Sequence, residues 1–196
     1  MVTALLIIAL VSIGILSWFM LREIGKSREF FKTLAAGLDG HATRLPFGAV
    51  FQLGSTQIRI FALQGSIYYR ARVHLRENPG VLVTRKFPRL RFLDRLNHAP
   101  FRQSFLFHTP VDEHYGFRAR DSRWMREIFD AELQRRMIET GRVTRIEVKR
   151  RAVTGALLML SHSDDERKKA AASIEIMNQV LMRVLGSSLV RGGGRL

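Results

Sequence analysis

The stretch QIRIFALQGSIYYRARVHL, residues 57–75, decides the fold class of this chain. Two runs of alternating apolar and polar residues flank Gln64-Gly65, a pair typical of a tight turn. A period of two is the pattern of a strand with one buried face and one wetter face. We therefore predict a β-hairpin here. The face expected to be buried in its second strand consists of Ile67, Tyr69, Ala71, Val73 and Leu75.

Further strands and helices are predicted on the C-terminal side of the hairpin. Strand patterns recur at residues 81–84, 101–108, 142–149 and 152–160. One helix is predicted from Asp121-Ser122 to about Thr140, and another after Ser163, where three acidic residues favour the positive end of the helix. This order favours an α+β domain, a mostly antiparallel sheet with two helices packed on it.

The N-terminal side reads VTALLIIALVSIGILSWFML, residues 2–21, and contains no charged side chain. As a helix it would extend about 30 Å, the thickness of a bilayer core. We predict a transmembrane anchor over residues 1–21. Its small residues, suited to close helix packing, are Ser12, Gly14 and Ser17. The residues expected at the membrane interface are Trp18, Arg22, Lys26 and Arg28.

A cleavable signal peptide is the competing interpretation of this segment. No Lys or Arg precedes the apolar run, the run is longer than a signal core, and a small-x-small cleavage pattern is missing. We therefore favour a retained single-pass anchor. Basic residues follow the anchor and none precedes it, so the positive-inside rule predicts an outer N-terminus and a cytoplasmic domain, in the inner (cytoplasmic) membrane of a bacterium.

Residues 22–39 continue the helical pattern, with Phe30, Phe31 and Leu34 as apolar positions. We favour a juxtamembrane helix that continues the anchor and packs on the domain, over an amphipathic helix lying on the membrane. Residues 40–190 then form the basic α+β domain. Residues 191–196, which include a glycine triplet, are predicted to be a flexible tail.

The domain is strongly basic, because 32 Lys and Arg oppose 17 Asp and Glu and the whole excess of +15 follows residue 21. Such a surface attracts anionic lipid, nucleic acid or an acidic protein. The sequence carries no RNA-recognition signature and no helix-turn-helix pattern, which disfavours nucleic acid without excluding it. The predicted basic patch consists of Arg85, Lys86, Arg89, Arg91, Arg95, Arg142, Arg145, Lys149, Arg150 and Arg151.

The motifs that carry familiar chemistry are missing from the sequence. The chain has no cysteine, no phosphate-binding glycine loop and no Gly-x-Ser-x-Gly elbow. His108, Asp112, Glu113 and His114 cluster without the helical spacing of a zinc motif, so we interpret them as a polar loop. We expect no enzymatic activity, no cofactor and no metal.

The expected function is that of a non-catalytic, membrane-anchored accessory or scaffolding subunit that stabilises a larger membrane protein complex. Bioenergetic complexes, photosynthetic or respiratory, are the context we expect for such a single-helix subunit. Its partners would be other membrane subunits and the anionic lipid surface. A membrane-tethered binder of polyanions is the second hypothesis, and a metal-dependent enzyme built on His108 and His114 is the third.

Overall fold

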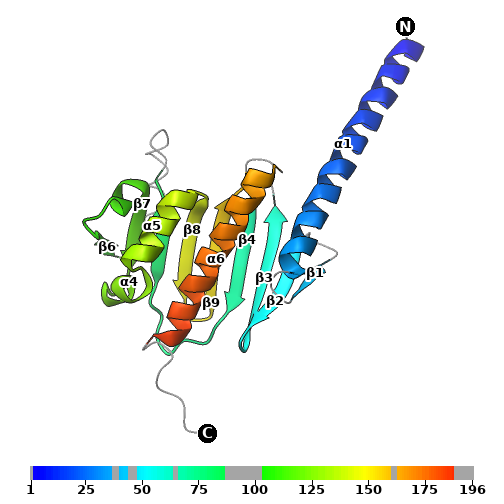
Figure 1. Ribbon diagram of the computed structural model, residues 1–196. Coiled ribbons are helices and arrows are strands. Elements are labelled where there is room, and N and C mark those ends of the chain that lie inside the picture. The colour runs from blue at the N-terminus through cyan, green and yellow to red at the C-terminus, as the bar shows by residue number, and fades with distance from the viewer. Residues whose placement is uncertain are drawn as a thin grey trace.

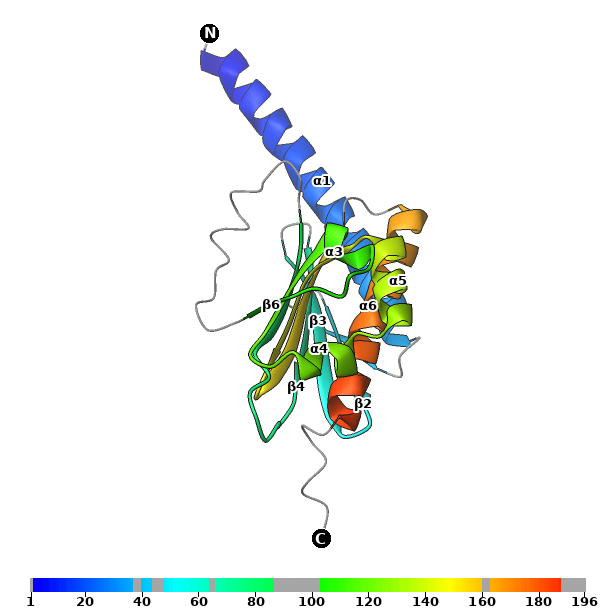
Figure 2. The same cartoon turned by 90° about the vertical axis from the view of Figure 1, so that its left-hand side faces the viewer.

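The computed structural model describes residues 2–36, 40–43, 48–63, 66–86, 103–159 and 163–187. In this part of the chain, nine strands form one sheet in which every pairing is antiparallel. Helices cover one face of the sheet, and a long N-terminal helix projects beyond the ends of the strands (Figures 1 and 2). The predicted α+β class with a mostly antiparallel sheet is confirmed.

The strands lie in the sheet in the order β1-β2-β3-β4-β9-β8-β5-β7-β6. Their bounds are β1 His41–Thr43, β2 Gly48–Leu53, β3 Thr56–Leu63, β4 Ser66–Arg72, β5 Val81–Arg85, β6 Gln103–Phe105, β7 Tyr115–Ala119, β8 Val143–Lys149 and β9 Ala152–Leu158. The helices are α1 Val2–Ala36, α3 Val111–His114, α4 Arg123–Ile128, α5 Ala131–Thr140 and α6 Asp164–Gly186.

The predicted hairpin is β3 and β4, which pair in register from Ile58 opposite Ala71 to Leu63 opposite Ser66. All five residues of the predicted inner face of residues 67–75 are buried, at most 4% exposed. The polar residues between them are half-buried or exposed. Alternation therefore predicted the correct side for each residue of this segment, because successive side chains in a strand point to opposite faces of the sheet.

The centre of the sheet joins distant parts of the chain. Strand β4 pairs with β9, with Tyr69 opposite Gly155, and β5 lies between β8 and β7. The hydroxyl of Tyr69 donates a 2.9 Å hydrogen bond to Oδ1 of Asn178 on α6. Met177 packs against Gly155, whose missing side chain makes room for it: a Cβ there would lie 2.6 Å from both Sδ and Cε of Met177.

The prediction of a single helix over residues 121–140 was wrong, because the segment forms two helices, α4 and α5. Asp130 is extended (φ −74°, ψ 174°), and its carboxylate accepts a 2.9 Å hydrogen bond from the backbone N–H of Leu133. An aspartate in this position caps a new helix N-terminus. The first helix begins at Asp121-Ser122 as predicted, where Ser122 makes no side-chain capping bond and Asp121 accepts from the N–H of Arg123.

Helix α6 begins as predicted, with the hydroxyl of Ser163 accepting from the N–H of Glu166. Its apolar stripe packs on the sheet and is completely buried at Met177, Val180, Leu181 and Val184. The predicted two helices were too few, since α3, α4, α5, α6 and the end of α1 all lie on this face (Figure 2).

Helix α1 runs without interruption from Val2 to Ala36. Its C-terminal turns pack on β1 and β2 and bury Phe30, Phe31 and Ala35, and the two phenylalanine rings meet edge to face at 5.1 Å. Nothing described covers the N-terminal turns, where Val11, Ile13, Leu16 and Trp18 are more than half exposed.

Among the described residues, no helix is long and apolar enough to cross a membrane. The transmembrane anchor therefore stays a prediction. The glycine-rich tail of residues 191–196 and the turn at residues 64 and 65 lie outside the described residues.

Candidate functional site: the open face of the sheet

The described helices pack on one face of the sheet. They do not cover the other face, here called the open face (Figure 2). Alternation along each strand divides the side chains between the two. The inward set is mostly apolar, whereas the outward set is mixed and its charged residues in the described strands are nearly all cations. Those on the open-face side of the described strands, here called the cationic face, are Arg59, Arg70, Arg72, Arg118, Arg145 and Lys149.

Strand register brings these residues into rows across the sheet. Arg59 of β3 lies directly opposite Arg70 of β4, and Arg70 lies opposite Thr154 of β9. Together with Gln57 and Arg72, the two arginines line a small depression of about 30 Å³. Like charges directly opposite each other destabilise a sheet, so the stability of the fold does not account for this pair.

Glu147 is the single acidic residue in the described strands. It is 7% exposed and forms ion pairs with its own strand neighbours, to Nη2 of Arg145 at 3.4 Å and to Nζ of Lys149 at 3.2 Å. One carboxylate therefore serves two cations, and the face keeps a large positive excess. An anionic group approaching it meets an attractive field.

Two further features give the open face some shape. The rings of Phe61 and Tyr68 stack with centroids 5.3 Å apart, on neighbouring strands. Near the other edge lies a hollow of about 120 Å³, whose lining includes Thr84, Ser104 and Arg118. Gly116 contributes no side chain there, which leaves room beside Thr84 and Lys86.

The predicted basic patch does not form one surface. Arg145 and Lys149 lie on the open face, whereas Arg85 donates to the carbonyl of Gly141 on the helix side. Arg142 forms an ion pair with Glu166, a residue only 8% exposed. Arg85 also opposes, by its charge, the effect of burial that raises the pKa of Tyr115 to about 12. Arg85 and Arg142 are thus engaged by the fold.

The remaining members of the predicted patch lie elsewhere. Lys86 donates its Nζ to the carbonyl of Asp112, and Arg150 and Arg151 form the exposed turn between β8 and β9. Arg89, Arg91 and Arg95 fall outside the described residues. The predicted patch does not include Arg59, Arg70, Arg72 and Arg118, although the alternation of their strands places the first three on a wetter face.

The polar cluster near His108 is explained by local hydrogen bonding. The Asp112 carboxylate accepts from the backbone N–H groups of Phe107, His108 and Thr109, at 3.2, 2.7 and 3.4 Å. These bonds hold His108 at a positive φ of 58°. In the described part of the chain, no group of three or more His, Cys, Asp and Glu residues is arranged to hold a metal ion.

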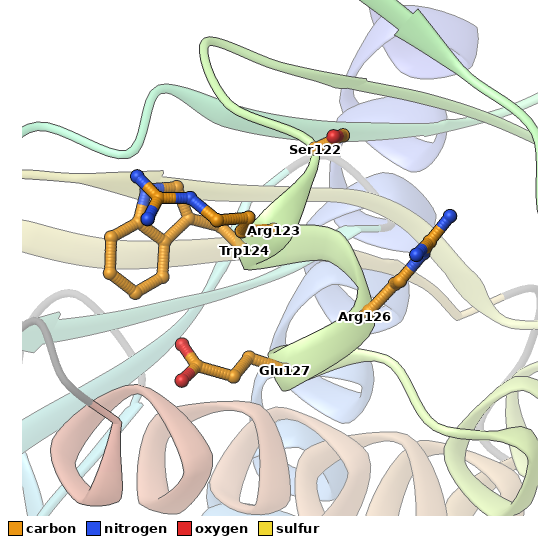
Figure 3. A pocket seen from close by; sticks show the side chains of 5 residues that line it. All are labelled: Ser122, Arg123, Trp124, Arg126 and Glu127. Carbon is orange, nitrogen blue, oxygen red and sulfur yellow. The ribbon is translucent and has the colours of Figure 1, made fainter.

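A second hollow, of about 460 Å³, lies beside α4 and is lined by Ser122, Arg123, Trp124, Arg126 and Glu127 (Figure 3). Arg123, Trp124 and Glu127 point to one side and Arg126 to the other. Arg123 pairs with Asp121 at 2.6 Å, and that hydrogen-bonded pair lowers the pKa of Asp121. The Arg126 guanidinium lies over the Phe105 ring at 5.8 Å. The two arginines of this hollow thus have partners within the fold.

The residues predicted for membrane contact lie along α1. Ser12, Gly14, Ser17 and Trp18 are exposed, as are Arg22 and Arg28, whereas Lys26 is half-buried. The Arg22 guanidinium lies 5.5 Å from the centroid of the Trp18 ring. Such a cation–aromatic pair can form in water or at a membrane interface.

No protein-family model matches the sequence, and no curated protein matches it. Among solved structures, the chain is similar to the crystal structure of the mycobacterial trehalose monomycolate transport factor A, TtfA. The TM-score is 0.53 at 11% sequence identity, over 81% of this chain and 94% of that chain. At this identity the likeness shows a shared fold alone: an antiparallel sheet with helices, traced along most of both chains.

Proposed function

We propose that this chain is a membrane-anchored, non-catalytic accessory protein whose cationic face binds an acidic surface of a membrane protein partner. The observation that carries the proposal is the cationic face itself. Its side chains point away from the core, and Arg59 and Arg70, which lie directly opposite each other, repel while the chain is alone. An acidic partner would remove that repulsion, and electrostatic complementarity of this kind sets specificity and speeds association.

The anchor is the second part of the proposal. The sequence of residues 2–21 is uncharged, and the described residues at its C-terminal end are exposed apolar side chains on a projecting helix. A contiguous exposed apolar surface of this kind needs a partner, which a bilayer would provide. With Arg22, Lys26 and Arg28 on the domain side, the positive-inside rule keeps the domain in the cytoplasm.

The arrangement of the domain favours a protein partner over lipid headgroups. Helix α1 projects beyond the ends of the strands. The open face therefore lies along the side of the domain and not at the end nearest the projecting helix (Figures 1 and 2). The cytoplasmic part of another protein in the same membrane could contact the whole area of the open face. Headgroup attraction decays within a Debye length, about 8 Å at physiological salt, so it would reach only part of that face.

The test compares the full chain with two variants extracted in mild detergent from its own membrane. Arg59→Gln/Arg70→Gln/Arg72→Gln removes three charges from the open face. Arg135→Gln/Arg136→Gln/Lys169→Gln removes three from the helix side and serves as the matched control. Native gels with mass spectrometry should show a stoichiometric complex for the wild type and the control, and its loss for the first variant. A wild-type chain that migrates alone would contradict the proposal.

Binding of a polyanion is the competing function, and the same variants distinguish it. If the purified wild type binds single-stranded nucleic acid or anionic liposomes in a salt-sensitive manner, and no complex survives extraction, the second hypothesis replaces the first. The stacked pair of Phe61 and Tyr68 is the feature that favours nucleic acid, since aromatic side chains stack on bases.

Topology is tested separately. Because the chain has no cysteine, a single one at the exposed Ser55 can report where the domain lies. We expect Ser55→Cys to react with a membrane-impermeant thiol reagent only after the cells are permeabilised. Strong labelling of intact cells would place the domain outside.

A further inference from the structure

A groove of about 350 Å³ lies between the C-terminal half of α1 and the N-terminal half of α6. It belongs to the helix side of the sheet, away from the cationic face. Phe30 and Leu34 of α1 and Ala171 and Ile174 of α6 form its apolar lining. Phe30 and Ile174 are almost completely buried, whereas Leu34 and Ala171 are half-buried and leave apolar surface in contact with solvent.

Two cations also line this groove. Arg167 and Lys168 come from the first turns of α6, at the end of the domain from which α1 projects (Figure 1). The Nε of Arg167 is buried and has no hydrogen-bond partner among the described residues. Its Nη1 lies 3.9 Å from Oδ1 of Asp164, whose side chain is 93% exposed. Such a long, solvated contact contributes little, so Arg167 is a weakly paired cation beside an apolar surface.

The polar residues that complete the lining have partners of their own. Glu175 accepts a 2.9 Å bond from Arg136, which offsets its negative charge. Thr33 donates its hydroxyl to the carbonyl of Glu29, and Asn178 accepts from Tyr69. The uncompensated charge of the groove is therefore positive, and it sits at one end of an otherwise apolar surface.

We propose that this groove binds a monoacyl anionic lipid, a long-chain fatty acid, with its acyl chain on the apolar lining and its carboxylate at Arg167 and Lys168. The volume is at the small end of ligand pockets, about 300–1,000 Å³, and fits one chain better than two. A carboxylate accepts two parallel hydrogen bonds from a guanidinium, so the partly exposed side chain of Arg167 can hold the headgroup at the end of the groove. The site is separate from the cationic face and does not depend on its partner.

The experiment uses the full chain in phosphatidylcholine nanodiscs and a photoreactive palmitic acid, with the labelled residues located by mass spectrometry. We expect labels on the segments that contain Phe30 and Leu34 and on those that contain Ala171 and Ile174. Arg167→Gln/Lys168→Gln should reduce this labelling about tenfold, the loss typical of a charged hydrogen bond. Lys169→Gln is the matched control, since Lys169 is next in sequence, pairs with Asp165 and does not line the groove.

Two further measurements identify the ligand class. The photoreactive methyl ester of palmitic acid keeps the chain and lacks the charge, so it should label the groove about tenfold less than the acid. Ala171→Phe, which fills the groove, should abolish labelling by the acid. Equal labelling by acid and ester, or labels confined to the exposed apolar half of α1, would overturn the proposal.

Discussion

The carboxylate of Asp130 joins three elements of the helical layer. It caps α5 through the N–H of Leu133 and pairs with Nη2 of Arg183 on α6 at 2.7 Å. Arg183 in turn donates to the carbonyl of Ile128, the last residue of α4. Partial burial of Asp130 raises its pKa, but the bonds from Arg183 and Leu133 outweigh burial, so the net pKa lies below its usual value.

We expect Asp130→Ala to lower the free energy of unfolding by about 1–2 kcal/mol at neutral pH, the cost of a lost cap with a small contribution from a half-exposed ion pair. Because the folded pKa is below the unfolded value near 3.9, this contribution is complete above the unfolded pKa and disappears as pH falls through the folded pKa. Urea unfolding of the full chain at several pH values measures it. Asp130→Asn, which keeps a capping oxygen, should lose less stability than Asp130→Ala. If the difference in the free energy of unfolding between the wild type and Asp130→Ala stayed the same at acid pH, the role of Asp130 as a charged cap would be contradicted.

Gly155 controls how closely α6 approaches the sheet. We expect Gly155→Ala to destabilise the protein by about 1–3 kcal/mol, because the new Cβ must displace the end of Met177, which is completely buried. Adding Met177→Ala, which alone should cost about 2–5 kcal/mol, relieves that clash. The double variant should therefore lose less than the sum of the singles, as a double-mutant cycle measures it. Additive losses would show that the cost of Gly155→Ala does not come from a clash with Met177.

At the scale of elements, α1 has two halves with different roles. Phe31 is 1% exposed, packed on the sheet, whereas Leu16 is 65% exposed on the projecting turns. We expect Phe31→Ala to lower the free energy of unfolding by about 3–5 kcal/mol, and Leu16→Ala to change it by less than about 0.5 kcal/mol. Chemical denaturation in a non-ionic detergent compares them. Equal small effects would mean that α1 is attached to the domain and not part of its core.

Local signals in the sequence predicted the elements that depend on local chemistry. The β3–β4 hairpin follows from alternation, and the start of α6 follows from Ser163 and the acidic residues after it. The break between α4 and α5 was missed because apolar residues keep helical spacing across it. Asp130 was the available signal, an N-cap residue placed within that spacing. The ion pair between Asp130 and Arg183 of α6 then holds the start of α5 in place.

The order of strands could not be predicted in the same way. Pairing of β4 with β9, and of β5 with both β7 and β8, joins segments far apart in the sequence and depends on packing of the whole core. The cationic face was missed although alternation placed Arg59, Arg70 and Arg72 on a wetter face, because these residues do not form a basic run in the sequence. Runs of basic residues in sequence, such as Arg142 and Arg145, were grouped together, although strand geometry directs Arg142 toward α6 and Arg145 to the open face.

For the whole molecule, the charge of the open face should leave a trace in the stability of the isolated chain. Arg59 and Arg70 lie opposite each other, and Arg72 and Lys149 extend the same field toward the neighbouring strands. Salt screens repulsion between exposed charges within a Debye length of about 10 Å at 0.1 M. A fold that carries such a face solely for binding would be stabilised by salt and by loss of charge.

We therefore expect Arg70→Thr to raise the free energy of unfolding by about 0.5–1 kcal/mol at low ionic strength, because it removes a like-charge pair and introduces a residue suited to strands. Added sodium chloride should stabilise the wild type and affect the variant less. Arg135→Gln is the control of opposite sign, since Arg135 pairs with Glu132 at 2.8 Å and Glu139 at 2.9 Å. That variant should lose a little stability, and salt should diminish the difference. If Arg70→Thr instead lowered the free energy of unfolding by about 0.5–1 kcal/mol, Arg70 would be a structural residue. The cationic face would then no longer require a partner to explain it.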